Sequence, residues 1–334
     1  MGSPEAADAR MRTIAIVNQK GGCGKTTTSI NLSATLAARG FRTLLVDLDP
    51  QSHCAAGLGV PEDRIEHGIA EALLAEPVGG ANPEAMLWEV AKNLRLAPST
   101  VALAGLEAAR GGLAVIADRD ARLAKLLDRL VDRFDWCIID CPPTIGLLTF
   151  NALRAADEAL VPVETGYFAL KGSERQVATI EAMASRLGRP LPLRILPTLH
   201  RPDAKLASDL HAAIQRRHGA STLPLSIREH EALREAAGFG QPVTEYAPGS
   251  AACEDFVRLV DWLLDNPVVS TRLGAGAAIV PIAEAEPEPA EAPSPRVADL
   301  LARMRAHAGF SADIDTQAAP PAQPTEPVRA EGHA

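Results

Sequence analysis

Short apolar runs recur along the chain in the pattern of buried parallel strands. The first, RTIAIVN at residues 12–18, is rich in β-branched residues and ends in a glycine-rich turn. Two later runs, TLLVD at 43–47 and WCIID at 136–140, are almost wholly apolar and end in Asp. Strands that are buried on both faces have this composition, whereas strands with one solvated face alternate. We predict strands at 12–18, 43–47, 136–140, 159–163 and 193–197.

Segments with helical spacing separate these runs. Within 26–39, the apolar residues Ile30, Leu32, Leu36 and Ala37 recur at helical intervals. The same spacing predicts further helices at 66–75, 118–132, 146–155, 168–188, 203–218 and 253–266. Alternating strands and helices predict an α/β fold with a doubly wound, mostly parallel sheet, in which ligands bind at the carboxyl ends of the strands.

The chain divides by composition into three parts. We predict a flexible N-terminus at 1–10, a folded domain at 11–268 and a disordered tail at 269–334. Residues 281–334 hold nine prolines and too few apolar residues to offset the entropy of ordering them. The exception is RVADLLARMRAHA at 296–308, whose apolar residues form one stripe of a short amphipathic helix. Because this stripe has no core to pack on, it predicts a partner.

Composition and charge narrow the function classes. With 47% hydrophobic residues, the chain can bury a sizeable core. No stretch approaches 18 consecutive apolar residues, and the first ten residues contain acids and no apolar signal region. We therefore expect a cytoplasmic protein. The net charge of −9 argues against a general affinity for nucleic acid, although a local patch of Lys and Arg could still bind phosphates.

The cysteines form no recognisable metal or disulfide pattern. Their number is odd, no two are spaced as CxxC, and no nearby His stands at zinc-ligand spacing. In a cytoplasmic chain this pattern favours reduced thiols, so we predict no metal cluster. The residues concerned are Cys23, Cys54, Cys137, Cys141 and Cys253.

A glycine-rich loop lies between the first predicted strand and the first predicted helix, where residues 20–27 read KGGCGKTT. Its glycines allow backbone N–H groups to approach phosphate oxygens, and the helix N-terminus adds positive potential. Lys25 is placed to reach the β- and γ-phosphates, and the Thr26 hydroxyl can ligate Mg²⁺. We predict that a nucleotide binds through Lys20, Gly21, Gly22, Cys23, Gly24, Lys25, Thr26 and Thr27.

The loop belongs to a longer set of motifs. LLVDLDPQ follows the first helix, IIDCPP stands at 138–143, LVPVETGYFALKG at 160–172, and SIREHEALREAAGFGQPVTEYAPGSAACEDF at 226–256. Together these motifs resemble the P-loop NTPases with a deviant Walker A sequence, and among them the ParA partition ATPases. The resemblance covers about residues 11–265.

The resemblance implies an ATP hydrolase that forms a homodimer around ATP. Lys20 is implied to reach across to the partner's nucleotide, while Lys25 contacts the nucleotide of its own chain. Positive charge at the γ-phosphate matters because phosphoryl transfer depends mostly on positioning and electrostatic stabilisation. Hydrolysis is expected to be slow alone and to be stimulated by a ParB-like or adaptor protein.

The resemblance also assigns roles to three acids. Asp49 matches the residue that orients the attacking water. Asp47 and Asp140 are implied to lie near Mg²⁺ together with Thr26. By turn propensity alone, Asp47 and Asp49 would instead be two solvated turn acids.

ParA-like proteins bind DNA without sequence preference through Lys and Arg of the C-terminal half, in the ATP-bound dimer. Arg228 matches one such position. The chain departs from the family at Asp203, where a basic residue is expected, and at Leu225 and Ser226, where the family usually has Arg-Asn. Each basic residue here can also be interpreted as an ordinary solvated charge. The implied DNA contacts are Arg201, Lys205, Arg216 and Arg228.

Two functions follow from these motifs. The first is a nucleoid-associated ATPase that positions cargo, either a replicon or a protein cluster. The alternative is a MinD-like regulator that cycles on a membrane. The helix at 296–308 lacks aromatic residues, which favours a protein partner over a membrane. A relative of the nitrogenase iron protein is excluded because residues 55–136 contain no cysteine.

Overall fold

The computed structural model describes residues 11–75, 82–107, 112–166 and 169–268, and only the backbone of residues 169–173. The predicted N-terminal segment 1–10, the tail 269–334 and the tail helix 296–308 lie outside the described residues. The proposed division of the chain at residue 268 therefore stays a prediction. Inside the described part, the last helix ends at Asp265.

The described residues form a sheet of seven strands in the order β3-β4-β2-β5-β1-β6-β7. Neighbouring strands are parallel except for β3 and β4 at one edge. This is the mostly parallel α/β sheet that the alternating pattern predicts. The strands are β1 (Arg12–Ile16), β2 (Thr43–Asp47), β3 (Trp88–Ala91), β4 (Leu94–Ala97), β5 (Trp136–Asp140), β6 (Glu158–Glu164) and β7 (Leu193–Thr198).

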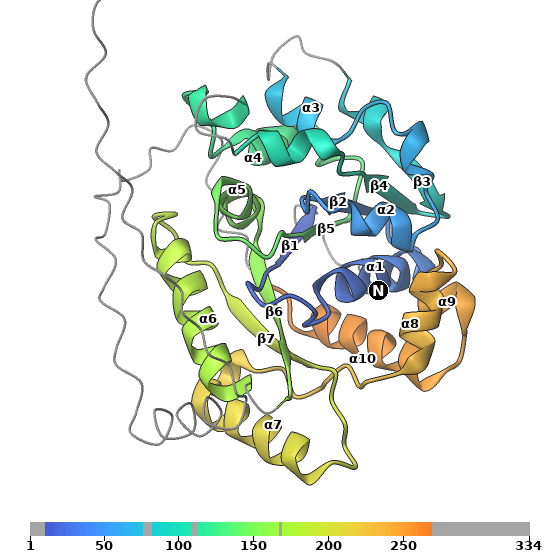
Figure 1. Ribbon diagram of the computed structural model, residues 1–334, viewed down its shortest axis with the longest axis vertical. Coiled ribbons are helices and arrows are strands. Elements are labelled where there is room, and N and C mark those ends of the chain that lie inside the picture. The colour runs from blue at the N-terminus through green and yellow to red at the C-terminus, as the bar shows by residue number, and fades with distance from the viewer. Residues whose placement is uncertain (1–10, 76–81, 108–111, 167–168, 269–334) are drawn as a thin grey trace, which may run out of the picture. The chain divides into compact units, whose positions relative to one another are not determined.

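Helices cover both faces of the sheet (Figure 1). They are α1 (Lys25–Ala38), α2 (His53–Gly57), α3 (Ile69–Leu74), α4 (Arg122–Asp128), α5 (Leu147–Ala155), α6 (Ala169–Ser185), α7 (Lys205–His218), α8 (Glu231–Gly238), α9 (Val243–Tyr246) and α10 (Ala251–Asp265). Short 3₁₀ turns span Glu62–Arg64, Pro83–Met86, Val101–Gly105, Gly112–Val115 and Gly219–Ser221.

Successive residues of each central strand enter different cores. Ala15 of β1 packs in the cluster that holds α3, α4, α5 and α6, whereas Ile14 and Ile16 pack in the cluster that holds α1, α2 and α10. Ile138 and Ile139 of β5 divide in the same way. Both faces of the sheet are therefore buried, which explains why the sequences of these strands are continuous apolar runs.

The five predicted strands and the seven predicted helices are all present. The sequence missed β3 and β4, because each has only four residues and carries a charged side chain, Glu89 or Arg95. It also missed α2, α8 and α9, which have at most eight residues. The predicted helix at 118–132 is shorter in the structure, where α4 spans Arg122–Asp128.

A buried ion-pair network anchors α10 to the sheet. Glu158 of β6 is fully buried and pairs with Arg12 of β1 and Arg194 of β7. Both guanidinium groups also donate to the C-terminal end of α10, Arg12 to the Leu263 carbonyl at 2.6 Å and Arg194 to the Asn266 carbonyl at 2.8 Å. This network fixes the helix that carries the end of the segment 226–256. Among the described residues, no helix has the length and apolar character needed to cross a bilayer.

Candidate nucleotide-binding site

The glycine-rich loop joins β1 to α1 at the carboxyl ends of the parallel strands. Gly22 and Gly24 have φ angles of +73° and +89°, a region that a residue with a side chain enters only with strain. These two conformations turn the chain from strand to helix without a side-chain cap on α1. The first N–H groups of a helix have no intrahelical partner, so this end of α1 suits a phosphate group.

Two buried residues outside the predicted site hold the loop in place. Thr198, at the end of β7, donates its hydroxyl to the Cys23 carbonyl at 2.8 Å. Asn18 donates its side-chain amide to the Pro162 carbonyl at 2.6 Å and accepts from the Lys20 backbone N–H at 2.9 Å. The loop is thus preorganised before any ligand arrives. Sequence reasoning missed both residues, although Asn18 stands in the motif beside the loop.

The two loop lysines have different surroundings. Lys25 is only 7% exposed, and its Nζ donates to the Lys20 carbonyl at 3.3 Å across the loop. The Lys20 side chain is 41% exposed and forms an ion pair with Glu164 at the end of β6 in its own chain. The structure thus holds Lys25 inside the loop and Lys20 at its outer side.

The acid at the end of β5 joins the sheet to α1. Thr26 donates its hydroxyl to Asp140 Oδ2 at 2.8 Å, and Ser29 donates to Asp140 Oδ1 at 2.8 Å. Asp140 is fully buried and lies opposite Asp47 in the register of β2 and β5. The tertiary structure therefore brings together the three predicted metal residues, Thr26, Asp47 and Asp140.

Asp47 and Asp49 are not solvated turn acids, because their exposed fractions are 0% and 6%. Asp47 accepts the backbone N–H groups of Asp49 and Cys54, each at 3.0 Å. Asp49 accepts the backbone N–H of Gln51 at 3.0 Å and lies on the wall of the pocket described below. These bonds fix the loop after β2 and leave Asp49 facing the space beside Lys25.

The paired acids favour a cation. Burial, together with the nearby Asp140 carboxylate, raises the pKa of Asp47 well above its ordinary value. Burial also raises the pKa of Asp140, against the hydrogen bonds from Thr26 and Ser29, which lower it. A bound divalent cation reverses this penalty on the charged forms. Carboxylate and hydroxyl oxygens are the ligands that Mg²⁺ prefers, so these residues fit a magnesium ion.

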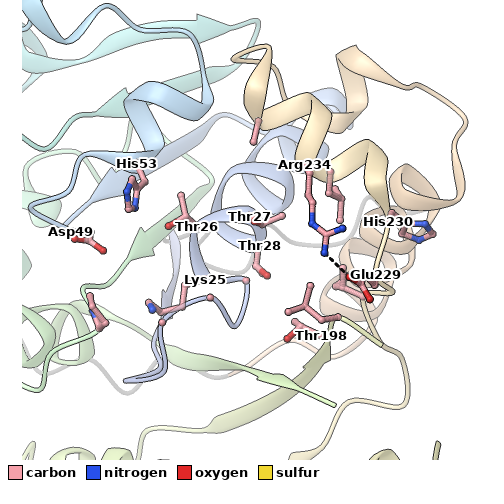
Figure 2. Close-up of a pocket in the computed structure, with 18 of the residues that line it drawn as sticks. Lys25, Thr26, Thr27, Thr28, Asp49, His53, Thr198, Glu229, His230 and Arg234 are labelled. Carbon is pink, nitrogen blue, oxygen red and sulfur yellow. Dashed lines mark hydrogen bonds and ion pairs between the residues drawn. The ribbon is translucent and has the colours of Figure 1, made fainter. Parts of the chain in front are cut away.

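A pocket of about 670 Å³ opens beside the loop (Figure 2). Lys25, Thr26 and Asp49 line one side, and Leu199, Ile227 and Leu233 contribute apolar surface elsewhere in the lining. The volume lies within the range of small-molecule sites. The cationic end suits the phosphates of a nucleotide, and the apolar side chains among the other lining residues suit its flat base.

The pocket has further lining residues that sequence reasoning did not single out. Figure 2 shows His53 on the side of Asp49, and Arg234 joined to Glu229 on the opposite side. The Arg234–Glu229 ion pair measures 2.5 Å. The motif at 226–256 implies a role for Arg228 alone. Its position against α1 depends on tertiary packing, which no local pattern reveals.

Arg228 lies at the edge of this pocket and is engaged by Asp255 of α10. Its guanidinium donates to both carboxylate oxygens at 2.7 to 3.1 Å, and its backbone N–H donates to Oδ2 at 2.9 Å. His230 and Arg258 also contact Asp255, which is fully buried. Burial raises the pKa of Asp255, but the hydrogen bonds from Arg228 and His230 outweigh it and leave this pKa lowered. Arg228 remains 30% exposed.

The other predicted DNA contacts lie in or beside α7, which packs against α6 (Figure 1). Lys205 begins this helix and Arg216 stands in its last turn, and both are exposed. Arg201, in the preceding loop, is exposed and stands 3.9 Å from Glu229. The bridge between His200 and Arg228 places Arg201 close to the segment that carries Arg228, whereas Arg216 stands near the other end of α7.

Comparisons with known proteins agree with this geometry. The model of the AAA domain family matches residues 11–192. The chain is 38% identical over 250 residues to the chromosome partitioning protein ParA of Myxococcus xanthus, covering 74% of this chain and 86% of that protein. It is 38% identical over 254 residues to the chromosome-partitioning ATPase Soj of Thermus thermophilus, covering 76% and 95%.

A solved structure is also similar over most of its length. It is the cobyrinic acid a,c-diamide synthase of Mycobacterium smegmatis, crystallised with a bound ATP analogue and magnesium. The TM-score is 0.62 at 31% sequence identity, over 76% of this chain and 94% of that one. The shared fold therefore extends well beyond the glycine-rich loop.

Proposed function

Because the chain belongs to the ParA/Soj family of chromosome-partitioning ATPases, we propose that it is an ATP-driven switch that positions or segregates cargo. The cargo is a chromosome, a plasmid or a protein cluster. One observation carries the proposal: the Thr26–Asp140 hydrogen bond at the start of α1, beside the nearly buried Lys25. It places a cation, a hydroxyl and a buried carboxylate at one end of a pocket of nucleotide size.

The nucleotide is ATP with Mg²⁺. The N-terminus of α1 and Lys25 bind the phosphates, and Leu199, Ile227 and Leu233 accommodate the base. Thr26 and the acids Asp47 and Asp140 would hold the magnesium ion, which would supply positive charge to the phosphates. Support comes from the Mycobacterium smegmatis relative, whose structure contains an ATP analogue and magnesium.

The active form is a homodimer in which Lys20 contacts the partner's nucleotide. In the single chain, Lys20 pairs with Glu164, and both side chains are at least 31% exposed. Ion pairs at such exposure contribute at most about 1 kcal/mol, so the γ-phosphate of a partner can replace Glu164. Glu164 thus keeps Lys20 near the site and leaves it able to exchange partners.

Lys20→Ala should still bind ATP but remain a monomer. The substitution leaves Lys25 and the start of α1 intact, and it removes the cation that the partner's phosphate requires. Light scattering with a nonhydrolysable ATP analogue measures the mass. Glu164→Gln is the matched control, because it removes the ion pair and keeps Lys20, and it should dimerise. A Lys20→Ala dimer would show that Lys20 does not act across the interface.

The ATP-bound dimer binds DNA, and the exposed basic side chains in and beside α7 contact the phosphates of the DNA. Each chain contributes three such residues, Lys205, Arg216 and Arg201. A dimer therefore presents twice as many basic side chains as a single chain. Doubling matters because the chain carries a net charge of −9, and binding to DNA scales with the phosphates neutralised. Arg228 adds a partly screened cation beside them. This proposal places the protein on the nucleoid, where a ParB-like or adaptor protein stimulates hydrolysis.

Lys205→Glu combined with Arg216→Glu should reduce retention of the ATP form on nonspecific duplex DNA at least about tenfold at low salt, because four basic charges per dimer are reversed. The slope of log affinity against log salt should become shallower by about 0.9 for each phosphate that the variant no longer neutralises.

Arg133→Glu is the control, since Arg133 is exposed near β3 and β4 at the opposite edge of the sheet. Unchanged retention in the double variant would contradict the DNA surface, and sedimentation of the wild-type ATP dimer with anionic vesicles alone would favour the membrane function.

A further inference from the structure

One polar side chain on the wall of the nucleotide pocket is left without a partner. His53, the first residue of α2, is exposed and lines the pocket on the side of Asp49 (Figure 2). Within the described part of the chain, its imidazole forms no hydrogen bond or ion pair. Arg234 and Glu229, on the opposite side of the pocket, neutralise each other instead. The roles proposed for the glycine-rich loop and for Asp49 give this ring no function.

The residue before His53 has a backbone conformation that residues with a side chain rarely adopt. Ser52 has φ +55° and ψ +31°, in the left-handed region. Its backbone N–H donates to the Asp49 carbonyl at 3.0 Å, and its hydroxyl donates to the Ser99 carbonyl at 3.0 Å. Strain of this kind persists where the surroundings impose it, and it concentrates at sites that bind or react. Here it sets the direction in which α2 leaves the turn at Asp49, and so places His53 at the pocket.

The helix that carries His53 is fixed at both of its ends. Its first turn is tied to the sheet, because the Cys54 N–H donates to the buried Asp47 carboxylate at 3.0 Å. At its end, Gly57 packs so closely on α1 that an added Cβ would lie 2.6 Å from Ile30 Cδ1. The ring of His53 is therefore exposed on a rigid support, an arrangement that holds a ligand contact in place before the ligand binds.

The position of His53 relates it to the terminal phosphate of the nucleotide. In the proposed function, Lys25 and the start of α1 bind the phosphates, and Asp49 orients the water that attacks the last of them. His53 follows Asp49 through a hydrogen-bonded turn and lies on the same side of the pocket. A ring that borders the site of attack lies nearest to the terminal phosphate. An imidazole N–H suits a phosphate oxygen, because hydrogen bonds to a charged acceptor are stronger than bonds between neutral groups.

We propose that His53 donates a hydrogen bond to the terminal phosphate of ATP and thereby lets the pocket discriminate ATP from ADP. This inference rests on the proposed function, because it requires ATP in the pocket. ADP lacks the phosphate that His53 contacts, so the residue contributes to the binding of ATP alone. The same contact orients the terminal phosphate toward the water at Asp49, so hydrolysis also depends on it.

The affinities for two nucleotides test the contact. His53→Ala should lower the affinity for a nonhydrolysable ATP analogue with Mg²⁺ by about tenfold or more, the effect of losing one hydrogen bond to a charged group. Its affinity for ADP with Mg²⁺ should stay within about twofold of wild type, as for an ordinary surface substitution. Isothermal titration calorimetry measures both. A structural defect of the site would weaken both nucleotides together, so the ratio of the two affinities reports the contact itself.

Two further variants separate the N–H group from the ring. His53→Phe keeps an aromatic ring without a donor and should lose the discrimination as the alanine variant does. His53→Gln supplies a side-chain N–H and should recover most of it. His67→Ala is the matched control, because His67 is exposed and lies outside the lining of the nucleotide pocket, and it should bind both nucleotides like wild type.

Hydrolysis gives a second readout. Phosphate release at saturating ATP should fall at least about tenfold in His53→Ala and His53→Phe, and it should be unchanged in His67→Ala. A wild-type ratio of ATP to ADP affinity in His53→Ala, or an equal loss for both nucleotides, would overturn the contact while the nucleotide site stands. If wild type binds neither nucleotide, the proposed function fails and this inference fails with it.

Discussion

Lys25→Ala should lower the affinity for ATP by at least about 30-fold. The lysine is 7% exposed inside the loop, so solvent hardly screens its contact with phosphate. Removing one partner of a buried charged pair costs about 2–5 kcal/mol, which corresponds to factors of roughly 30 to several thousand. Isothermal titration calorimetry with ATP and Mg²⁺ gives the affinity directly.

The control for this loss is Lys92→Ala. Lys92 is an exposed lysine in the turn between β3 and β4, away from the pocket beside the loop. It should bind ATP like wild type, and both variants should have the circular dichroism spectrum of the wild-type fold. Normal ATP affinity in Lys25→Ala would refute the assignment of the loop as the phosphate site.

Asp49→Ala should retain ATP and lose hydrolysis by a factor of about 10² to 10⁴, the usual contribution of a residue that positions or activates the nucleophile. Binding depends on the loop and α1, whereas hydrolysis needs an oriented water. Asp49 is held at the pocket by the Gln51 N–H, on the side of the pocket where Lys25 lies. The variant should therefore accumulate as an ATP-bound dimer. Phosphate release and size-exclusion chromatography in ATP measure the two properties.

Asp49→Asn separates the carboxylate from the turn that it stabilises. Asparagine keeps an oxygen that can accept the Gln51 N–H, so the loop after β2 should hold its shape. It lacks the negative charge, and we expect the same loss of hydrolysis as for alanine. Wild-type turnover in the asparagine variant, or a monomer under saturating ATP, would contradict the role of Asp49.

Local sequence patterns sufficed for much of the fold. Continuous apolar runs predicted β1, β2, β5, β6 and β7, because each of these strands is buried between two layers of helices. The KGGCGKTT loop predicted the phosphate site, because glycine conformations and a following helix are short-range properties. The sequence patterns did not predict the short elements, because these span too few residues to show a periodic spacing of apolar side chains. They are β3, β4, α2, α8 and α9.

Other features depend on contacts that no local pattern encodes. The sheet inserts β5 between β1 and β2, which brings Asp140 opposite Asp47 and places Cys54 against both. The same packing sets Asp255 on Arg228, so a residue expected to face DNA is already bonded within its own chain.

By itself, the sequence determined the order along the chain of the five longer strands and of the seven helices predicted with them, the phosphate loop and the acids that end β2 and β5. These features follow from local periodicity and from short runs of residues with fixed conformational needs. Only the tertiary structure decided which charges neutralise one another: Lys20 with Glu164, 144 positions away, and Arg228 with Asp255. The physical reason is that ion pairs depend on distances in space, and strand order and helix packing set these distances through burial of apolar surface.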